Sequence, residues 1–66
     1  MSKNNLKAIK LQFDAHKIHI ESGNERLIAG SYNQIAILYK VQEDYENAIL
    51  YYKKAIEINK RIGNKL

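Results

Sequence analysis

The amino-acid sequence repeats part of itself after forty residues. Aligning the chain with itself at this offset gives six identical pairs, nearly all of them small or apolar: Ala8 and Ala48, Ile9 and Ile49, Ala15 and Ala55, Ile18 and Ile58, Gly23 and Gly63, Asn24 and Asn64. A fixed period of about 20–50 residues is typical of stacked repeat architectures. The repetition predicts that the first and last segments of the chain are the same structural element used twice.

The breaks between elements are marked by glycine, asparagine and aspartate, because the sequence contains no proline. Gly23 suits the left-handed conformation that ends a helix, and Asn24 suits the cap of the next one. Asp44 is the natural cap of a further helix. No segment shows the period-two alternation of a strand. We therefore expect an all-α fold of three antiparallel helices, over residues 4–21, 25–40 and 44–61.

The length of 66 residues allows one small domain, which we expect to span 1–66. Such a domain buries only about 60% of the surface of its unfolded chain, and the absence of cysteine removes disulfides as reinforcement. No apolar run has the length of a membrane span or of a signal-peptide core. We expect a soluble, cytoplasmic protein that has no membrane partner.

Catalytic and metal-binding patterns are missing from the sequence. There is no Ser/His/Asp set, no pair of catalytic carboxylates and no glycine-rich phosphate loop. His16 and His19 are three residues apart, which is a weak metal-binding pattern when no other ligand accompanies it. We expect no enzymatic activity, no metal and no cofactor.

A specific spacing of aromatic, aliphatic and small residues runs through the second half of the chain. The residues that carry it are Tyr32, Ile35, Ala36, Tyr39, Ala48, Tyr52 and Ala55. This pattern is similar to the tetratricopeptide repeat, a pair of antiparallel helices. The resemblance implies one full repeat over residues 25–61, preceded by helix 4–21 as the second helix of an earlier repeat. Small residues let two helices approach closely, and we expect the gaps to be filled by Tyr32, Tyr39, Tyr45 and Tyr52.

The chain departs from the family pattern at two positions. Glu43 stands where the family often has glycine in the turn between its helices, and Lys60 replaces the closing proline. A residue other than glycine in a left-handed turn costs about 1 kcal/mol, which favours a different turn here. The missing proline suggests a longer variant of the repeat, of about forty residues.

The family resemblance also implies a concave groove for peptides or other protein segments. By position, its contacts here are Asn33, Ile37 and Lys40. Family members that grip a terminal carboxylate use a Lys/Asn set, and this chain has asparagine and isoleucine at two of those positions. We therefore expect no carboxylate clamp. The alternative interpretation is that these side chains simply face solvent.

Helix 4–21 is apolar on two sides. Leu6, Phe13 and Ile20 form one stripe at heptad spacing, although their equivalents forty residues later are charged. We expect the opposite face to pack on the second helix; it consists of Ala8, Leu11, Ala15 and Ile18. The stripe is then a candidate surface for self-association. The alternative is that the third helix or the chain's own tail covers it.

Helix 44–61 also carries two apolar stripes. One consists of Tyr45, Ile49, Tyr52 and Ile56, and the other of Tyr51, Ile58 and Ile62. A helix of this kind is suited to receive a further helix. Either the chain is a piece of a longer array, or a second copy supplies the neighbour, for instance by domain swapping.

These features predict a non-catalytic scaffold module that binds a protein or peptide by burying an apolar helical face, and that forms a homo-oligomer. Two alternatives remain. The chain can be an excised or reconstructed repeat unit with only a structural role. A net charge of +4 and clustered lysines are also compatible with a nucleic-acid-binding domain, although the lysines lie at ordinary positions for a solvated helix face.

Overall fold

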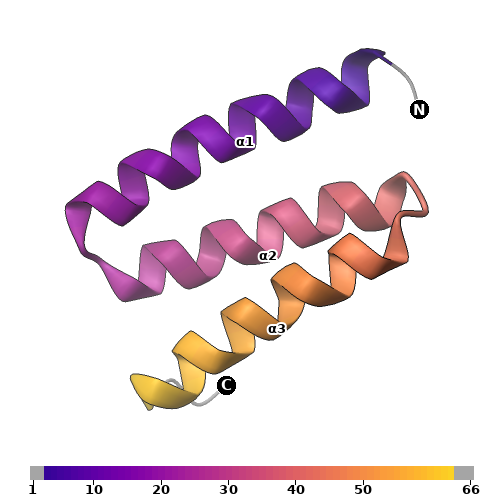
Figure 1. The fold of residues 1–66 in the computed structure, drawn as a ribbon. Helices are drawn as coiled ribbons and strands as arrows, with labels where there is room; N and C mark the ends of the chain where they lie inside the picture. The colour runs from indigo at the N-terminus through magenta and orange to yellow at the C-terminus, as the bar shows by residue number, and fades with distance from the viewer. Residues whose placement is uncertain (1–2, 64–66) are drawn as a thin grey trace.

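The computed structural model describes residues 3–63, which form three helices: α1 (Lys3–Ser22), α2 (Glu25–Val41) and α3 (Tyr45–Arg61). Consecutive helices run in opposite directions (Figure 1). No strand occurs among the described residues. The expected all-α fold of three antiparallel helices is confirmed, and each helix boundary lies within about one residue of the prediction.

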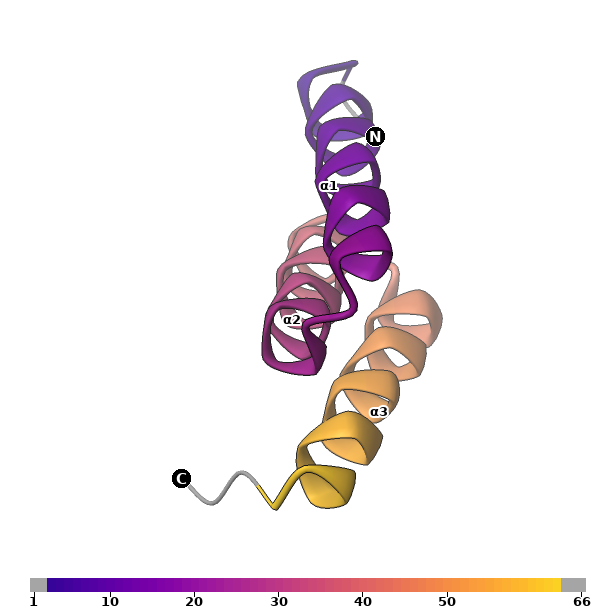
Figure 2. The same cartoon turned by 90° about the vertical axis from the view of Figure 1, so that its left-hand side faces the viewer.

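The middle helix, α2, packs against both of its neighbours. In the described part of the chain no Cα atom of α1 lies within 8 Å of a Cα atom of α3. Seen along the helices, the three axes form a bent row with α2 at the bend (Figure 2). The two outer helices can therefore meet only through long side chains.

Each of the two turns supplies a cap for the helix that follows it. The Asn24 side chain accepts a hydrogen bond from the backbone N–H of Leu27 at 3.3 Å. The Asp44 side chain accepts one from the N–H of Asn47, also at 3.3 Å. Both caps satisfy donors that a helix start leaves free, as the sequence predicted.

The turn between α2 and α3 keeps its left-handed residue although that residue is not glycine. Glu43 has a φ of 63°, close to the 72° of Gly23 in the first turn. Its N–H donates to the carbonyl of Lys40, and the N–H of Asp44 donates to that of Tyr39, each at 2.9 Å. This is the Schellman arrangement. The different turn that the sequence favoured is not found, because two hydrogen bonds hold Glu43 in place.

The buried apolar residues of α2 and α3 are mostly small. They are Ala29, Ile35, Ala36, Ala48, Ala55 and Ile58. Alanine at these positions lets the two helices approach closely. Tyr32, Tyr39 and Tyr52 are half-buried beside this core. Tyr45 is exposed, so the prediction that it fills the interhelix gap is wrong: it is the first residue of α3, where the turn carries it to the rim.

Candidate functional site

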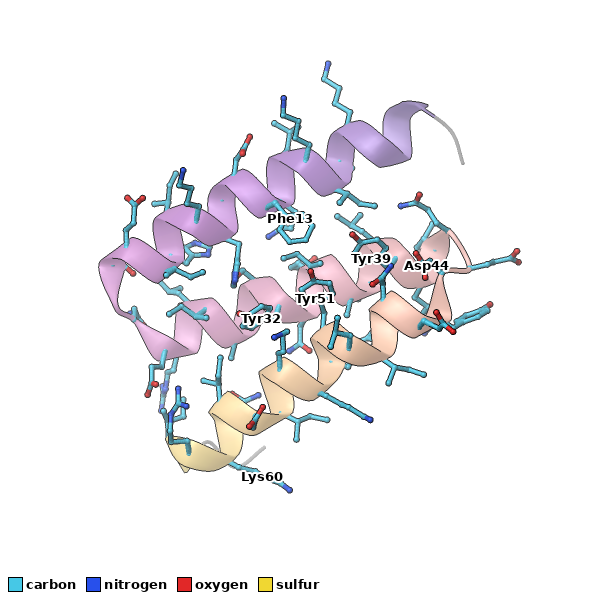
Figure 3. All side chains as sticks on the ribbon, in the orientation of Figure 1. Phe13, Tyr32, Tyr39, Asp44, Tyr51 and Lys60 are labelled. Carbon is cyan, nitrogen blue, oxygen red and sulfur yellow. The ribbon has the colours of Figure 1, made fainter. Side chains whose placement is uncertain are left out.

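A cluster of aromatic rings joins the three helices, and Tyr51 lies at its centre. The Tyr51 ring stacks on Tyr39 with 5.7 Å between centroids and lies 5.9 Å from Tyr32. Phe13 of α1 meets Tyr51 edge to face at 5.7 Å. Figure 3 shows these rings in the space between the ribbons. Edge-to-face and offset contacts of this kind add to the free energy of burial, and here they connect α1 to α3.

The position of Tyr51 in this cluster changes the pKa of its hydroxyl. Burial raises the pKa of its hydroxyl, and the nearby Tyr39 and Tyr32 raise this pKa further. The repeat pattern did not identify Tyr51, because it uses the adjacent Tyr52. The signal that points to Tyr51 is its stripe with Ile58 and Ile62, the side of α3 that faces inward.

One polar pair is buried between α1 and α2. Nδ1 of His16 is hydrogen-bonded to the hydroxyl oxygen of Ser31, and that hydroxyl also lies 2.9 Å from the carbonyl oxygen of Ile28, to which it can donate. The His16 ring also lies 4.2 Å from the ring of Tyr32. Burial lowers the pKa of His16, and the neighbouring His19 lowers it further. This pair was not predicted from the sequence, since its members are fifteen residues apart and the repeat pattern assigns neither of them a role.

The face of α1 that packs on α2 is not the predicted one. From Lys7 onward, the part of α1 whose side chains the structure describes, the buried residues are Ile9 and His16, with relative exposures of 8% and 5%. Leu11 and Ile18, which were expected to pack on α2, are 60% and 66% exposed. That prediction is wrong because it assumed that α1 packs on α2 through the same face that α3 uses. The second helix of a repeat packs on its own first helix through one side and on the next repeat through another.

The stripe predicted for self-association is divided in the structure. Phe13 turns inward against Tyr51, so at this residue the third helix covers the stripe, as the alternative interpretation has it. Ile20 is exposed. The side chain of Leu6 lies outside the described part of the chain. Self-association itself remains a prediction.

The uncovered apolar surface of α1 lies on its other side. We call it the α1 outer face; it consists of Ala8, Leu11, Ala15 and Ile18. Forty residues later, the equivalents of Ala8, Ala15 and Ile18 are buried against α2. The α1 outer face is therefore equivalent to a surface of α3 that is packed in the structure. On α1, no described residue covers Leu11 and Ile18 of this face.

A second uncovered apolar surface lies on α3. We call it the α3 open face; it consists of Tyr45, Ile49, Tyr52 and Ile56. Ile49 and Ile56 are each 53% exposed. Their equivalents on α1 are Ile9 and His16, which are both buried, His16 in contact with Ser31 of α2. The α3 open face therefore corresponds, forty residues later, to the face of α1 that packs on α2.

The predicted groove residues lie on α2. Ile37 and Lys40 are exposed and Asn33 is half-buried, and their spacing places all three on one side of the helix. Gly30 lies one turn earlier on that side, and an added Cβ there meets no atom within 4 Å. The side chains are accessible as the family resemblance requires, but their role as peptide contacts remains a prediction.

Comparison with known families decides what kind of chain this is. Residues 29–61 match the family described as Tetratricopeptide repeat. The chain belongs to this family. No curated protein and no solved structure gave a significant match. The matched segment runs from Ala29 to Arg61, so the repeat includes most of α2, the Glu43 turn and all of α3.

Membership of the tetratricopeptide repeat family has direct consequences for function. Such repeats are protein-interaction modules and are generally non-catalytic. Among the described residues, no three His, Cys, Asp or Glu side chains gather in a way that suits a metal ion. None of the described helices has both the length and the apolar content that crossing a membrane requires.

Proposed function

We propose that this tetratricopeptide repeat chain is a scaffold module that self-associates through the α1 outer face. The observation that carries the proposal is the exposure of Leu11 and Ile18 on a surface whose equivalent in α3 is packed. Leaving large apolar side chains in water forfeits roughly 1.5–3 kcal/mol each, so covering two of them is a substantial driving force. A second copy of the chain carries the same face.

The α1 outer face is complementary to itself when two copies lie antiparallel. In the register that places Ile18 beside Ala8 of the other copy, Leu11 lies beside Ala15. Each large side chain then meets a small one, which lets the two helices approach closely. The interface is symmetric, as in most homodimers.

Charges beside the α1 outer face favour the same arrangement. Lys7 and Glu21 are both exposed and lie along one edge of this face, two heptads apart. Antiparallel pairing brings Lys7 of one copy near Glu21 of the other, twice per dimer. Asp14 lies midway between them and meets its own copy near the symmetry axis, which opposes dimerisation slightly.

The first experiment measures the mass of the chain in solution by light scattering, over a hundredfold range of concentration. We expect a dimer that the variant Ile18→Lys converts to a monomer with unchanged helical circular dichroism. Ile20→Lys is the matched control, because Ile20 is also exposed but belongs to the stripe with Leu6 and Phe13. If Ile20→Lys dissociates the dimer and Ile18→Lys does not, that stripe is the interface and the α1 outer face is not.

A charge exchange tests the orientation. Lys7→Glu and Glu21→Lys are each expected to weaken the dimer severalfold, because each creates two like-charge contacts. The double variant restores the two opposite-charge contacts with their signs reversed. Its dimer is expected to recover the dissociation constant of the unaltered chain. Failure of the double variant to recover excludes the antiparallel register.

Alongside self-association, we propose Asn33, Ile37 and Lys40 as contacts for a peptide on α2. The exposure of Ile37 and Lys40 supports this role. Substituting Ile37→Asp with Lys40→Glu is expected to abolish capture of a bound peptide and to leave the mass unchanged. A change of mass in this variant, with peptide capture retained, contradicts the assignment.

A further inference from the structure

A titratable side chain, His16, is buried between α1 and α2. Its relative exposure is 5%, and its Nδ1 atom is hydrogen-bonded to the hydroxyl of Ser31, a residue that is 3% exposed. Its ring lies 4.2 Å from the ring of Tyr32, the next residue of α2. Both groups that face His16 from α2 are uncharged. The contact of α1 with α2 therefore includes a group that changes its charge near physiological pH.

The groups around His16 offer no compensation for a positive ring. Burial lowers the pKa of His16, and His19, one turn further along α1, lowers it further. From α3, the Nζ atom of Lys54 lies over the Tyr32 ring, 5.9 Å from the ring centroid. No carboxylate of a described residue lies within ion-pair distance of His16, and Asp14, close to it in the sequence, is exposed. A proton on His16 thus adds a charge that no described group neutralises.

Helix α1 is held by few buried side chains. Where the structure describes its side chains, Ile9 and His16 are the buried ones. Its link to α3 is the edge-to-face contact of Phe13 with Tyr51. Among the described residues no Cα atom of α1 lies within 8 Å of a Cα atom of α3. The attachment of α1 therefore depends strongly on the state of His16.

The packing of α3 on α2 does not involve His16. The turn at Glu43 joins the two helices at one end, and an ion pair of Glu25 with Arg61 joins them at the other. Because α1 has no backbone close to α3, the buried residues of α3 are covered chiefly by α2; they are Ala48, Ala55 and Ile58. A charge in the α1–α2 interface leaves these contacts in place.

We propose that protonation of His16 detaches α1 from the other two helices in mildly acidic solution, while α2 and α3 stay packed on each other. The neutral ring is compatible with the buried interface, whereas the charged ring is fully solvated only after α1 has separated. Separation uncovers the rings of Tyr32 and Tyr51, which α1 contacts through His16 and Phe13. The switch concerns the side of α1 that faces α2, so it operates whether or not the α1 outer face binds a second copy.

The sign of the pH response follows from the two pKa values of His16. The pKa is lowered while α1 is attached, and it returns to an ordinary value of 6.5 when α1 separates. Well above pH 6.5 both states carry a neutral ring, so the attachment does not depend on pH. Below pH 6.5 the detached state binds the proton. The ratio of attached to detached chains then falls by up to about tenfold per pH unit, until the lowered pKa is reached.

Solution NMR of the full chain at pH 7.5 and pH 5.0 tests the switch through proton NOEs between rings. The NOEs of His16 with Tyr32 and of Phe13 with Tyr51 report the attachment of α1. The NOE of Tyr39 with Tyr51 reports the packing of α2 on α3. We expect the two α1 NOEs to lose most of their intensity at pH 5.0 and the Tyr39–Tyr51 NOE to remain. Ordinary carboxylates, with pKa values of about 4, stay mostly charged at this pH.

Variants at the two histidines identify the titrating group. His16→Leu replaces the ring with an uncharged side chain of similar size and is expected to keep the Phe13–Tyr51 NOE at pH 5.0. His16→Gln retains a polar partner for Ser31 and should likewise show no change between the two pH values. The matched control is His19→Leu, the same substitution one turn away, which leaves His16 in place and should still lose the NOE at pH 5.0.

Other outcomes overturn the proposal. Loss of the Tyr39–Tyr51 NOE together with both α1 NOEs shows that the whole chain unfolds as one unit. Loss of the His16–Tyr32 NOE alone shows that the ring leaves the interface while α1 stays attached. If all three NOEs persist at pH 5.0, or if both His16 variants lose the Phe13–Tyr51 NOE as the unaltered chain does, the charge of His16 does not control α1.

Discussion

The hydroxyl of Ser31 is hydrogen-bonded to Nδ1 of His16 across the α1–α2 interface, and it lies 2.9 Å from the carbonyl oxygen of Ile28 on its own helix. When the hydroxyl proton is directed to the Ile28 carbonyl, neutral His16 carries its proton on Nδ1. A second proton on the ring adds a positive charge to a buried interface, next to His19 and against the ring of Tyr32. Burial and the neighbouring His19 therefore favour the neutral imidazole and lower the pKa of His16.

The stability of the chain is expected to fall in mildly acidic solution because of His16. Its pKa is lowered in the folded state from an ordinary value of 6.5. Below pH 6.5 the unfolded chain therefore binds a proton that the folded chain does not, and the free energy of unfolding decreases with a slope of at most about 1.4 kcal/mol per pH unit from this group. Urea denaturation at pH 7.5, 6.5 and 5.5 measures the effect.

A histidine variant separates this effect from other titrating groups. His16→Gln is expected to be less stable at pH 7.5 but to lose most of the pH dependence between 7.5 and 5.5. His19→Gln should keep most of that dependence, because His19 is the lesser cause of the His16 shift. An unchanged pH dependence in His16→Gln shows that another group is responsible.

Replacement of Tyr51 is expected to loosen α1 from α3. Tyr51→Ala removes the ring that Phe13, Tyr32 and Tyr39 contact and should lower the free energy of unfolding by about 2 kcal/mol. Tyr51→Phe keeps the ring and should cost less than about 1 kcal/mol. Thermal and urea unfolding give these values. Tyr45→Ala, at an exposed position, is the control and should change stability by less than about 0.5 kcal/mol.

The left-handed turn offers a stabilising substitution. Glu43 has a φ of 63°, a conformation that glycine adopts without steric cost. Glu43→Gly is expected to raise the free energy of unfolding by up to about 1 kcal/mol, measured by urea denaturation. Glu43→Ala keeps the Cβ atom and should give no such gain. Equal stabilisation by both variants attributes the effect to lost charge instead.

Two glycines are expected to respond in opposite directions to the same substitution. Gly30 lies within α2 and has open space around an added Cβ, so Gly30→Ala should stabilise by about 0.5–1 kcal/mol. Gly23 has a φ of 72°, so Gly23→Ala should destabilise by about 1 kcal/mol. Comparing their melting temperatures checks both signs. A higher melting temperature for both variants shows that the first turn does not hold its left-handed conformation.

Local chemistry made the helices and caps predictable from the sequence. Asn24 and Asp44 act as caps wherever a helix begins, and Gly23 suits a left-handed turn in any fold. The core positions Ala36, Ala48 and Ala55 were also predictable, because repeat spacing places small residues between paired helices. These features depend only on residues near one another in the sequence or on a fixed repeat.

Contacts between helices were harder to predict where a helix is apolar on several sides. On α1 both Ile9 and Ile18 are apolar, and only the structure shows that Ile9 is the buried one. Tyr51 and Tyr52 are adjacent and chemically identical, so their different roles depend on how α1 lies above α3. The His16–Ser31 pair depends on the register of α1 against α2, which no local pattern encodes.

The lack of backbone contact between α1 and α3 determines how the molecule opens. Backbone packing runs from α1 to α2 and from α2 to α3, and α1 reaches α3 through the side-chain contact of Phe13 with Tyr51. An outer helix can separate while the other two stay together, so amide hydrogens of α1 should exchange with solvent before those of α2. A partner that binds α1 is therefore expected to slow exchange of the α1 amides and to protect that helix from proteolysis, while leaving the opening of α3 unchanged.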